Sequence, residues 1–223
     1  NKTPFSKHLT SLIKYADFGI SDVKSVPANI PSDIWHQFKE QMKTQIGADE
    51  GKLEEAFNIK NATQLQFTHT GEDSSSAGFG LDNESRGTVA ALSFFSLALR
   101  QLSMPTVTLI DEIDTSLHPT LVAELVALYT DPATNPHGSQ LIFTTHDVSL
   151  INQSGSSNRL LQPDQIWLVE KDKDGASELF PVTELGIRKE ENIGKNYLNG
   201  VYGATPNPSF HTVFAQIMNG DDD

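Results

Sequence analysis

The stretch Thr106-Val-Thr-Leu-Ile-Asp-Glu-Ile-Asp-Thr-Ser-Leu-His-Pro119 carries most of the information on the fold. Within it a short and mostly apolar run, Val107–Ile110, is followed at once by Asp111 and Glu112. Such a run is typical of a strand in a parallel sheet whose two faces are both covered by helices. Open α/β sheets bind ligands at the carboxyl ends of their strands. We therefore expect the two carboxylates to lie at a ligand-binding edge.

A second apolar strand is predicted downstream, in Gln140-Leu-Ile-Phe-Thr-Thr-His146. The helix predicted between the two strands, at about Thr120–Tyr129, completes the strand–helix–strand unit of a parallel sheet. This topology brings His146 to the same edge as Asp111 and Glu112. A neutral imidazole there could contact a phosphate group or orient an attacking water. By itself, a single histidine would more often be structural.

A third motif, Asn83-Glu-Ser-Arg-Gly-Thr88, precedes a helix predicted over Gly87–Leu102. Ser85 would offer a hydroxyl group at the positive end of this helix, where free N–H groups favour an anion. Gly87 would allow close approach of the backbone. The structural alternative is a helix cap provided by Ser85 or Asp82.

The strand-end carboxylates suit the hydrolytic side of a nucleotide site. Asp111 could hold Mg²⁺, which prefers carboxylate oxygen, and Glu112 could act as the general base that activates water. The alternative is a solvated pair that caps the following helix. The sequence contains no Gly-x-x-x-x-Gly-Lys-[Ser/Thr] phosphate loop. The residues therefore predict half of a nucleotide site.

Composition narrows the class of protein. The 223 residues include 37% hydrophobic residues, no cysteine and a net charge of −13. Disulfide frameworks, zinc–thiolate sites and thiol nucleophiles are excluded, and the acidic surface disfavours nucleic acid as the main partner. No apolar run reaches the roughly 20 residues that span a bilayer, and the N-terminus lacks a signal-peptide core. We expect a cytoplasmic protein, and the absence of an initiator Met suggests a fragment or a processed chain.

Periodicity predicts the remaining elements. We expect one lobe made of residues 1–26 and 62–223, and a helical insertion over 27–61. The segment Gly71–Gly78 is rich in Gly and Ser and is predicted to be a flexible loop. Other predicted elements are a helix over Phe5–Ala16, a turn and short strand over Asp17–Val23, a strand over Thr63–His69, and an antiparallel hairpin of Gln165–Glu170 with Glu178–Val182.

Taken in order, Ser-Arg-Gly-Thr, Leu-Ile-Asp-Glu-Ile-Asp-Thr-Ser-Leu-His-Pro and Phe-Thr-Thr-His resemble the C-terminal half of ABC-type ATPases outside the transporter family. They are most similar to AAA/ABC-like ATP-binding proteins of the overcoming-lysogenization-defect-related group, which belong with abortive-infection proteins. The resemblance covers Phe79–Ile151, and the tail Arg188–Pro206 is also similar. It implies the C-terminal lobe of a RecA-like P-loop NTPase, α/β with a largely parallel sheet flanked by helices and a C-terminal β-hairpin.

The resemblance also implies residue roles. Ser85, Arg86 and Gly87 would form the signature element that meets the γ-phosphate held by the opposite protomer, with Arg86 where transporter proteins carry Gly. The other implied roles are Asp111 as the Walker B carboxylate on Mg²⁺, Glu112 as the catalytic base, Asp114 to His118 as the D-loop at the dimer interface, and His146 as the switch histidine.

The implied activity is ATP hydrolysis in a head-to-tail homodimer, with ATP and Mg²⁺ at the interface. A Walker A-containing lobe would be needed in cis or in trans, so we expect the chain alone to be inactive. An effector protein and a role in anti-phage defence or nucleic-acid handling would follow from the family. Two alternatives remain: a non-catalytic dimerisation or effector-recruiting module, and a metal-dependent nuclease using the acidic turn Glu170–Gly175.

Overall fold

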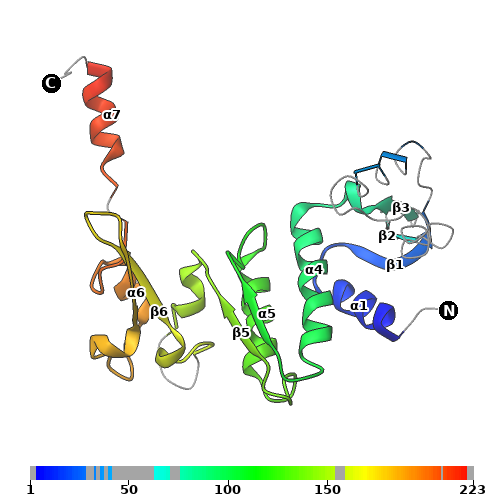
Figure 1. Cartoon of the computed structure of the whole chain (residues 1–223), viewed down its shortest axis with the longest axis horizontal. Coiled ribbons are helices and arrows are strands. Elements are labelled where there is room, and N and C mark those ends of the chain that lie inside the picture. The colour runs from blue at the N-terminus through cyan, green and yellow to red at the C-terminus, as the bar shows by residue number, and fades with distance from the viewer. Residues whose placement is uncertain are drawn as a thin grey trace. The chain divides into compact units, whose positions relative to one another are not determined.

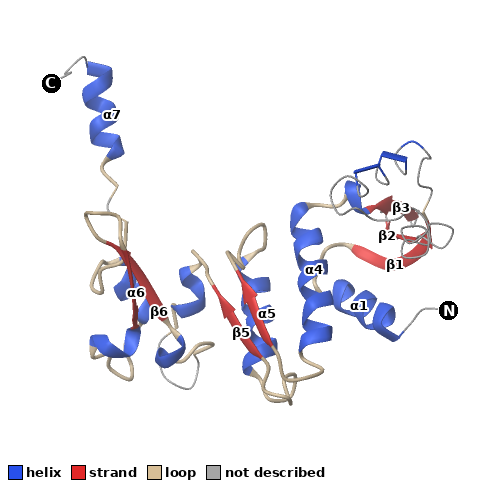
Figure 2. Ribbon diagram, viewed as in Figure 1, coloured by secondary structure: helices blue, strands red, loops and turns tan. Residues whose placement is uncertain are grey.

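The computed structural model describes residues 4–28, 33, 36–37, 40–41, 63–70, 76–153, 159–206 and 208–219. The chain divides into two compact units (Figure 1). Unit 1 comprises Asn1–Met104 with Thr115–Leu117, and unit 2 comprises Pro105–Asp114 with His118–Asp223. The helices and strands of both units are coloured by type in Figure 2.

Unit 1 combines two helices with a three-stranded antiparallel sheet. Its sheet has the order β1-β2-β3. The predicted N-terminal helix and the first two strands are confirmed. The elements are α1 (Pro4–Tyr15), β1 (Ile20–Pro27), β2 (Thr63–Thr70), β3 (Ser76–Gly80), the short 3₁₀ helix η2 (Leu81–Asn83) and α4 (Arg86–Gln101).

Strand β3 corrects the loop predicted over Gly71–Gly78. Residues 71–75 lie outside the described part of the chain, but Ser76–Gly80 pairs with β2, with Phe79 opposite Phe67. Composition alone favoured a turn, because Ser and Gly have low strand propensity. Pairing with a neighbouring strand overrides this preference, since strand formation depends strongly on context.

The core of unit 1 lies between the two helices and the sheet. Phe67 of β2 and Ile13 of α1 are almost fully buried. On α4 the buried positions are Thr88, Ala91, Leu92, Phe94, Phe95 and Ala98. The predicted helix is confirmed. Among its larger apolar residues Leu92 and Phe95 are buried, whereas Val89, Leu99 and Leu102 are half-buried. The alanines let α4 approach its neighbours closely, so they take core positions.

Unit 2 begins with the predicted strand–helix–strand element. Strand β4 (Val107–Ile110) and strand β5 (Gln140–Phe143) are parallel, with Ile110 opposite Phe143. Helix α5 (Pro119–Thr130) connects them and starts with Pro119 after the N-cap His118. Proline is favoured at the first helical position because it has no N–H group to leave unpaired. Within the described residues β4 and β5 are the only parallel pair, and the other two sheets are antiparallel.

The apolar sequence of β4 predicted that helices cover both faces of the β4–β5 pair. This prediction is wrong for one face. Val107 is 57%, Leu109 73% and Ile142 57% exposed, whereas Thr108 is 5% exposed. Successive side chains of a strand point to opposite faces, so Val107 and Leu109 share one open face. The sequence showed an apolar surface, but it could not show that Val107 and Leu109 on one face are exposed.

The C-terminal part of unit 2 builds a core of its own. Buried Ile166, Leu168, Val182, Ile193 and Tyr202 form it. The predicted antiparallel hairpin is confirmed as β6 and β7. The elements are η3 (Val148–Ile151), η4 (Pro163–Gln165), β6 (Trp167–Lys171), β7 (Ser177–Pro181), η5 (Val182–Leu185), α6 (Ile193–Leu198) and α7 (Phe210–Asn219).

The insertion predicted over 27–61 lies mostly outside the described residues. The isolated positions described within it are helical, at 33, 36–37 and 40–41. The division into a lobe of 1–26 with 62–223 and an insertion therefore stays a prediction. No helix in the described ranges is long and apolar enough to cross a membrane.

Candidate functional site

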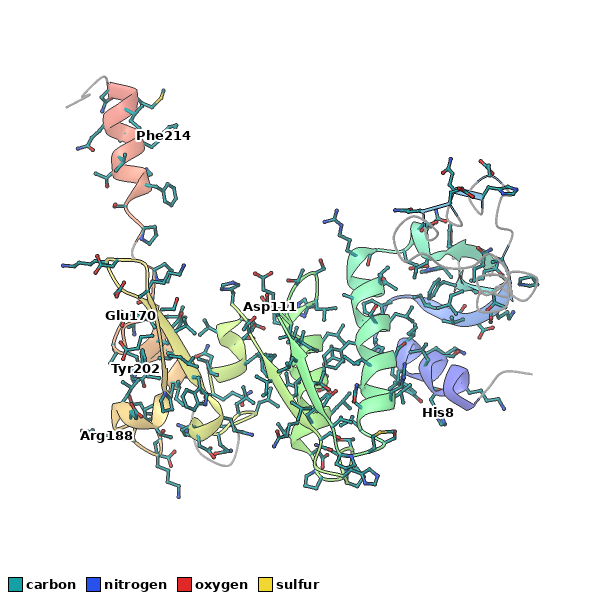
Figure 3. The ribbon with its side chains drawn as sticks, in the orientation of Figure 1. His8, Asp111, Glu170, Arg188, Tyr202 and Phe214 are labelled. Carbon is teal, nitrogen blue, oxygen red and sulfur yellow. The ribbon has the colours of Figure 1, made fainter. Side chains whose placement is uncertain are left out.

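Two polar strand ends meet at the carboxyl edge of β4 and β5. Asp111 follows β4 directly, and Thr144 follows β5 (Figure 3 labels Asp111). The Thr144 Oγ1 hydroxyl donates to Asp111 Oδ1 at 2.5 Å, and the Glu112 N–H group donates to Thr144 Oγ1 at 2.7 Å. The Ile113 N–H group donates to the Thr144 carbonyl oxygen at 3.0 Å. The parallel register thus ties the Asp111–Glu112 pair to the end of the neighbouring strand.

Glu112 and His146 are brought together as the sequence predicted. The distance from Glu112 Oε1 to His146 Nε2 is 3.8 Å, and the two side chains are 58% and 85% exposed. An ion pair this exposed contributes little to stability, so its importance lies in its position. Glu112 has a φ of 49°, a left-handed conformation that L-residues other than Gly, Asn and Asp seldom adopt. The bonds around Thr144 hold the backbone in this conformation.

Asp114 is fixed by the residues that lead to His146. Its Oδ1 atom accepts from Thr145 Oγ1 at 2.6 Å and from the His146 N–H group at 3.3 Å. Burial raises the pKa of Asp114, but these two hydrogen bonds, its own N–H group and the nearby His146 outweigh burial and lower the pKa below its usual value. Thr145 Oγ1 also accepts from the Asp147 N–H group at 3.0 Å. Asp114 is therefore held as a carboxylate beside the switch-histidine candidate.

The donor set at this edge fits Mg²⁺ only as part of a larger site. Asp111 is an exposed carboxylate, and its Oδ2 atom takes no part in the bond to Thr144. No group of three or more His, Cys, Asp or Glu side chains in the described part of the chain could enclose a metal ion. Mg²⁺ is commonly held by one or two carboxylates together with phosphate oxygens and water. Asp111 could therefore supply one oxygen ligand of such a site, and the other ligands would have to come from outside the described residues.

The start of α4 in unit 1 has the predicted helix cap. Ser85 is the N-cap: its Oγ atom accepts from the Thr88 N–H group at 3.0 Å and shares a hydrogen bond with Thr88 Oγ1 at 2.9 Å. Asp82 lies in η2. The preceding residue, Glu84, is nearly buried, and its Oε1 atom lies 2.8 Å from His69 Nε2 on β2. Arg86 is exposed at the first turn.

Gly87 packs closely against a backbone carbonyl group, and its approach to an anion stays a prediction. A Cβ atom built on Gly87 would lie 2.7 Å from the carbonyl oxygen of Ser116. Ser116 has a φ of 66° and belongs to unit 1 together with α4. In this structure Gly87 therefore leaves room for the backbone of the Asp114–His118 loop. At the end of this loop, His118 Nδ1 accepts a hydrogen bond from the Thr120 N–H group at 3.3 Å.

The predicted site residues thus form two groups. Unit 2 contains the strand-end and loop residues Asp111, Glu112, Asp114, His118 and His146. Unit 1 contains the residues at the start of α4, Ser85, Arg86 and Gly87. Within unit 2 the strand ends collect the carboxylates and His146 at one edge.

Sequence reasoning missed the threonines that organise this edge. Thr144 and Thr145 were read only as the end of an apolar strand, although both use their hydroxyl groups on the predicted site carboxylates. Polar, β-branched residues directly before a candidate histidine were the available signal. The His69–Glu84 pair left no such signal, because neither residue stands beside a predicted site residue at the end of a parallel strand.

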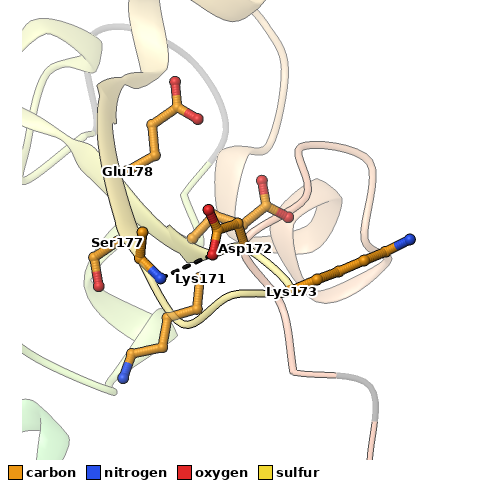
Figure 4. A pocket seen from close by; sticks show the side chains of 7 residues that line it. Lys171, Asp172, Lys173, Ser177 and Glu178 are labelled. Atoms are coloured by element: carbon orange, nitrogen blue, oxygen red, sulfur yellow. Dashed lines mark hydrogen bonds between the residues drawn. The ribbon is translucent and has the colours of Figure 1, made fainter.

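The acidic hairpin turn does not form a comparable site. Asp172 Oδ1 accepts the N–H groups of Asp174 and Ala176 at 2.9 and 2.8 Å, so this oxygen stabilises its own turn. The hollow beside it is lined by Lys171, Asp172, Lys173, Ser177 and Glu178 (Figure 4). Lysines among the lining residues oppose the binding of a metal ion.

The larger part of the chain matches a known protein family. Residues 2–152 match the family model described as "AAA domain, putative AbiEii toxin, Type IV TA system". The chain belongs to this AAA-domain family. The match includes both groups of predicted site residues and extends upstream of Phe79, where the strong part of the sequence resemblance begins. It ends before the C-terminal hairpin, so the tail of this AAA-domain protein lies outside it.

The family supports an AAA-type, ATPase-like α/β domain. A solved structure described in connection with ATP-driven dimerisation and DNA-stimulated activation of SMC ATPases is similar to this chain, with 15% identity and a TM-score of 0.48 over 91% of this chain and 93% of that one. No curated protein matches the sequence.

Proposed function

We propose that this chain supplies the signature and Walker B half of an ABC-type ATPase. The observation that carries the proposal is the meeting of Glu112 and His146, 3.8 Å apart, at the edge where Asp111 ends a parallel strand. A carboxylate that binds metal, a second carboxylate and an imidazole are the groups that position and activate water for phosphoryl transfer. Membership in an AAA-domain family supports the same chemistry.

The proposed roles follow from exposure and bonding. Asp111 holds Mg²⁺, which neutralises charge on the transferred phosphoryl group when it is bound. Glu112 is exposed at the strand end and accepts a proton from the attacking water. His146 lies beside Glu112 and orients that water or contacts the γ-phosphate. Asp114 fixes His146 through the hydrogen bond to its N–H group.

Ser85 and Gly87 form the proposed signature element for a nucleotide held by another protomer. The Ser85 hydroxyl already caps α4, so its contribution to an anion is made together with the first N–H groups of that helix. Because Gly87 packs against the Ser116 carbonyl oxygen, the signature element and the D-loop are mechanically linked. Head-to-tail assembly of two copies would place both elements at one interface.

A partner lobe with a phosphate loop completes the proposed site. The sequence has no such loop, and the face of β4–β5 with Val107, Leu109 and Ile142 is exposed. Burial of apolar surface contributes roughly 25 cal/mol per Å², so this face favours a packed neighbour. The lobe acts in cis or in trans, and the complete unit works as a homodimer.

The biological setting is proposed from the family alone. The family description names a toxin of a type IV toxin–antitoxin system, which agrees with the resemblance to the overcoming-lysogenization-defect-related group and with an anti-phage role acting through an effector protein. The net charge of −13 makes this chain a poor main surface for nucleic acid.

The substitution Glu112→Gln tests the proposal in the protein completed with its phosphate-loop lobe. It removes the general base and keeps the size of the side chain, so turnover should fall by about 100-fold or more while an ATP-bound dimer accumulates. The matched control is Glu124→Gln, at an exposed position of α5, which should turn over normally. Unchanged turnover in the Glu112→Gln protein would reject Glu112 as the general base and with it the proposed site. Absence of turnover in the completed wild-type protein would leave the non-catalytic module of the same fold.

A further inference from the structure

Thr144 contacts both members of the carboxylate pair with one hydroxyl group. Its Oγ1 atom donates to Asp111 Oδ1 at 2.5 Å and accepts from the Glu112 N–H group at 2.7 Å. A hydroxyl group has one donor and two acceptor positions, so both bonds can form at the same time. Thr144 directly follows β5, whereas the carboxylates follow β4, and the contact therefore crosses between neighbouring strands.

We infer that Thr144 is a positioning residue that sets the geometry of Asp111 and Glu112 through this shared hydroxyl. The inference rests on the proposed function, because it assigns a task to Thr144 in the same ATPase site. It adds a residue that neither the sequence reading nor the family match assigns.

The hydroxyl group fixes the rotation of the Asp111 carboxylate. Its Oδ1 atom is taken by Thr144, so Oδ2 is the oxygen left for a cation. A hydrogen bond to an ionised carboxylate is stronger than a neutral one. The Thr144 hydroxyl therefore selects which carboxylate oxygen faces the site and keeps Asp111 from rotating freely at an exposed edge.

The same hydroxyl group helps to hold the unusual backbone at Glu112. A φ of 49° is disfavoured for a residue with a Cβ atom, and such conformations persist only where neighbouring groups enforce them. The Thr144 hydroxyl accepts from the N–H group of Glu112, and the Thr144 carbonyl oxygen accepts from the N–H group of Ile113. Two consecutive backbone groups are thus anchored to one residue of β5, and the direction in which the Glu112 carboxylate leaves the backbone is set.

Substitutions at Thr144 separate this task from simple packing. Thr144→Val keeps the branched shape and removes the hydroxyl group, whereas Thr144→Ser keeps the hydroxyl group and removes a methyl group. Loss of packing would affect Thr144→Ser, and loss of positioning would affect Thr144→Val. Thr130→Val is the matched control, because its hydroxyl group bonds only the Ala127 carbonyl oxygen near the end of α5.

Amide hydrogen exchange on this chain gives a readout that does not depend on ATP. In Thr144→Val the Glu112 N–H group should exchange about 2- to 10-fold faster, as expected for loss of one hydrogen bond. The Ile113 N–H group serves as an internal control, because its acceptor is the backbone of Thr144. Equal exchange at Glu112 in the wild type and in Thr144→Val would overturn the inference.

Turnover in the completed protein provides the second readout. Thr144→Val should lower kcat by about 10- to 100-fold, the range that a small misplacement of catalytic groups produces, with a smaller change in KM. Thr144→Ser and Thr130→Val should stay near wild type. If Glu112→Gln abolishes turnover and Thr144→Val leaves it unchanged, the inference fails and the proposed function stands. If Glu112→Gln has no effect, the proposed function itself fails.

Discussion

At the scale of single residues, the environment of Gly87 determines which substitution it tolerates. A Cβ atom at this position would lie 2.7 Å from the carbonyl oxygen of Ser116, which is a backbone atom that cannot rotate away. We expect Gly87→Ala to lower the free energy of unfolding by about 1–3 kcal/mol, the usual cost of overpacking. Denaturant unfolding followed by circular dichroism would measure this change.

Gly80→Ala is the control for this prediction. Gly80 also belongs to unit 1, and a Cβ atom there would meet only Asn83 Oδ1 at 3.9 Å, an ordinary contact. Its effect on stability should therefore be smaller than that of Gly87→Ala. Equal stability of the Gly87→Ala protein and the wild type would show that the Ser116 loop does not pack on α4.

Asp114 gives a prediction about acid stability. Its pKa is lowered in the folded protein because the hydrogen bonds from Thr145 and from backbone N–H groups outweigh burial. A carboxyl group of this kind adds stability above its unfolded pKa, and the contribution is lost as the pH falls through the lower folded pKa. Thr145→Val should raise the pKa of Asp114 and reduce the acid-dependent loss of stability. Carboxyl-carbon NMR titration measures the pKa directly, with Thr130→Val as the control.

Some features of the site could be predicted from the sequence and others could not. Asp111, Glu112 and His146 could be placed at one edge because they lie within three residues of the carboxyl ends of two predicted parallel strands. The bond from Thr144 to Asp111 could not be predicted, because it depends on register: Ile110 lies opposite Phe143, so the residues that follow are also neighbours. A shift of one residue would have turned Thr144 to the other face.

At the scale of elements, the β4–α5–β5 unit has one supported face and one open face. Leu125 on α5 is 1% exposed and Leu109 on β4 is 73% exposed. We expect Leu125→Ala to cost about 2–5 kcal/mol of stability through loss of burial and formation of a cavity. Leu109→Ala should change the stability of the isolated chain by only about 0.5 kcal/mol or less. Thermal unfolding of both variants measures the contrast.

A large loss of stability in Leu109→Ala would show that the open face is covered in solution by something other than the described residues. The two leucines make a matched pair, because the deleted atoms are the same and only their surroundings differ. If both variants unfold like the wild type, α5 does not form the supported face.

Most elements were predictable because their cause is local. Helix α4 follows from its apolar positions and from Ser85 at its start, and β6–β7 from an Asp-Gly turn between alternating strands. Strand β3 was not predictable in the same way, because Ser76–Gly80 becomes a strand only by pairing with β2. The exposure of β4 also depended on a neighbour that the strand sequence does not contain.

At the scale of the whole molecule, the tail is explained by packing. Tyr202 is buried in the C-terminal core, and its hydroxyl group donates to Glu191 Oε1 at 2.8 Å. The Ala204 N–H group donates to Glu170 Oε1 on β6 at 3.2 Å, in the region of unit 2 where Figure 3 labels Glu170 and Tyr202. The tail thus closes the hairpin core by packing against it.

At the scale of the whole molecule, the proposed ATPase activity depends on a phosphate loop, which this sequence does not contain. In the proposed function Asp111, Glu112 and His146 act on a phosphoryl group, but the sequence has no phosphate loop to hold one. We expect the chain alone to show no saturable hydrolysis of Mg-ATP, and a lobe that carries the loop to restore it. Phosphate release at increasing ATP concentration measures hydrolysis by the chain alone and by the chain with the added lobe, with Glu112→Gln as the blank. If the chain alone hydrolyses ATP and Glu112→Gln abolishes this hydrolysis, other residues of this chain hold the phosphates. The site is then complete without a partner lobe.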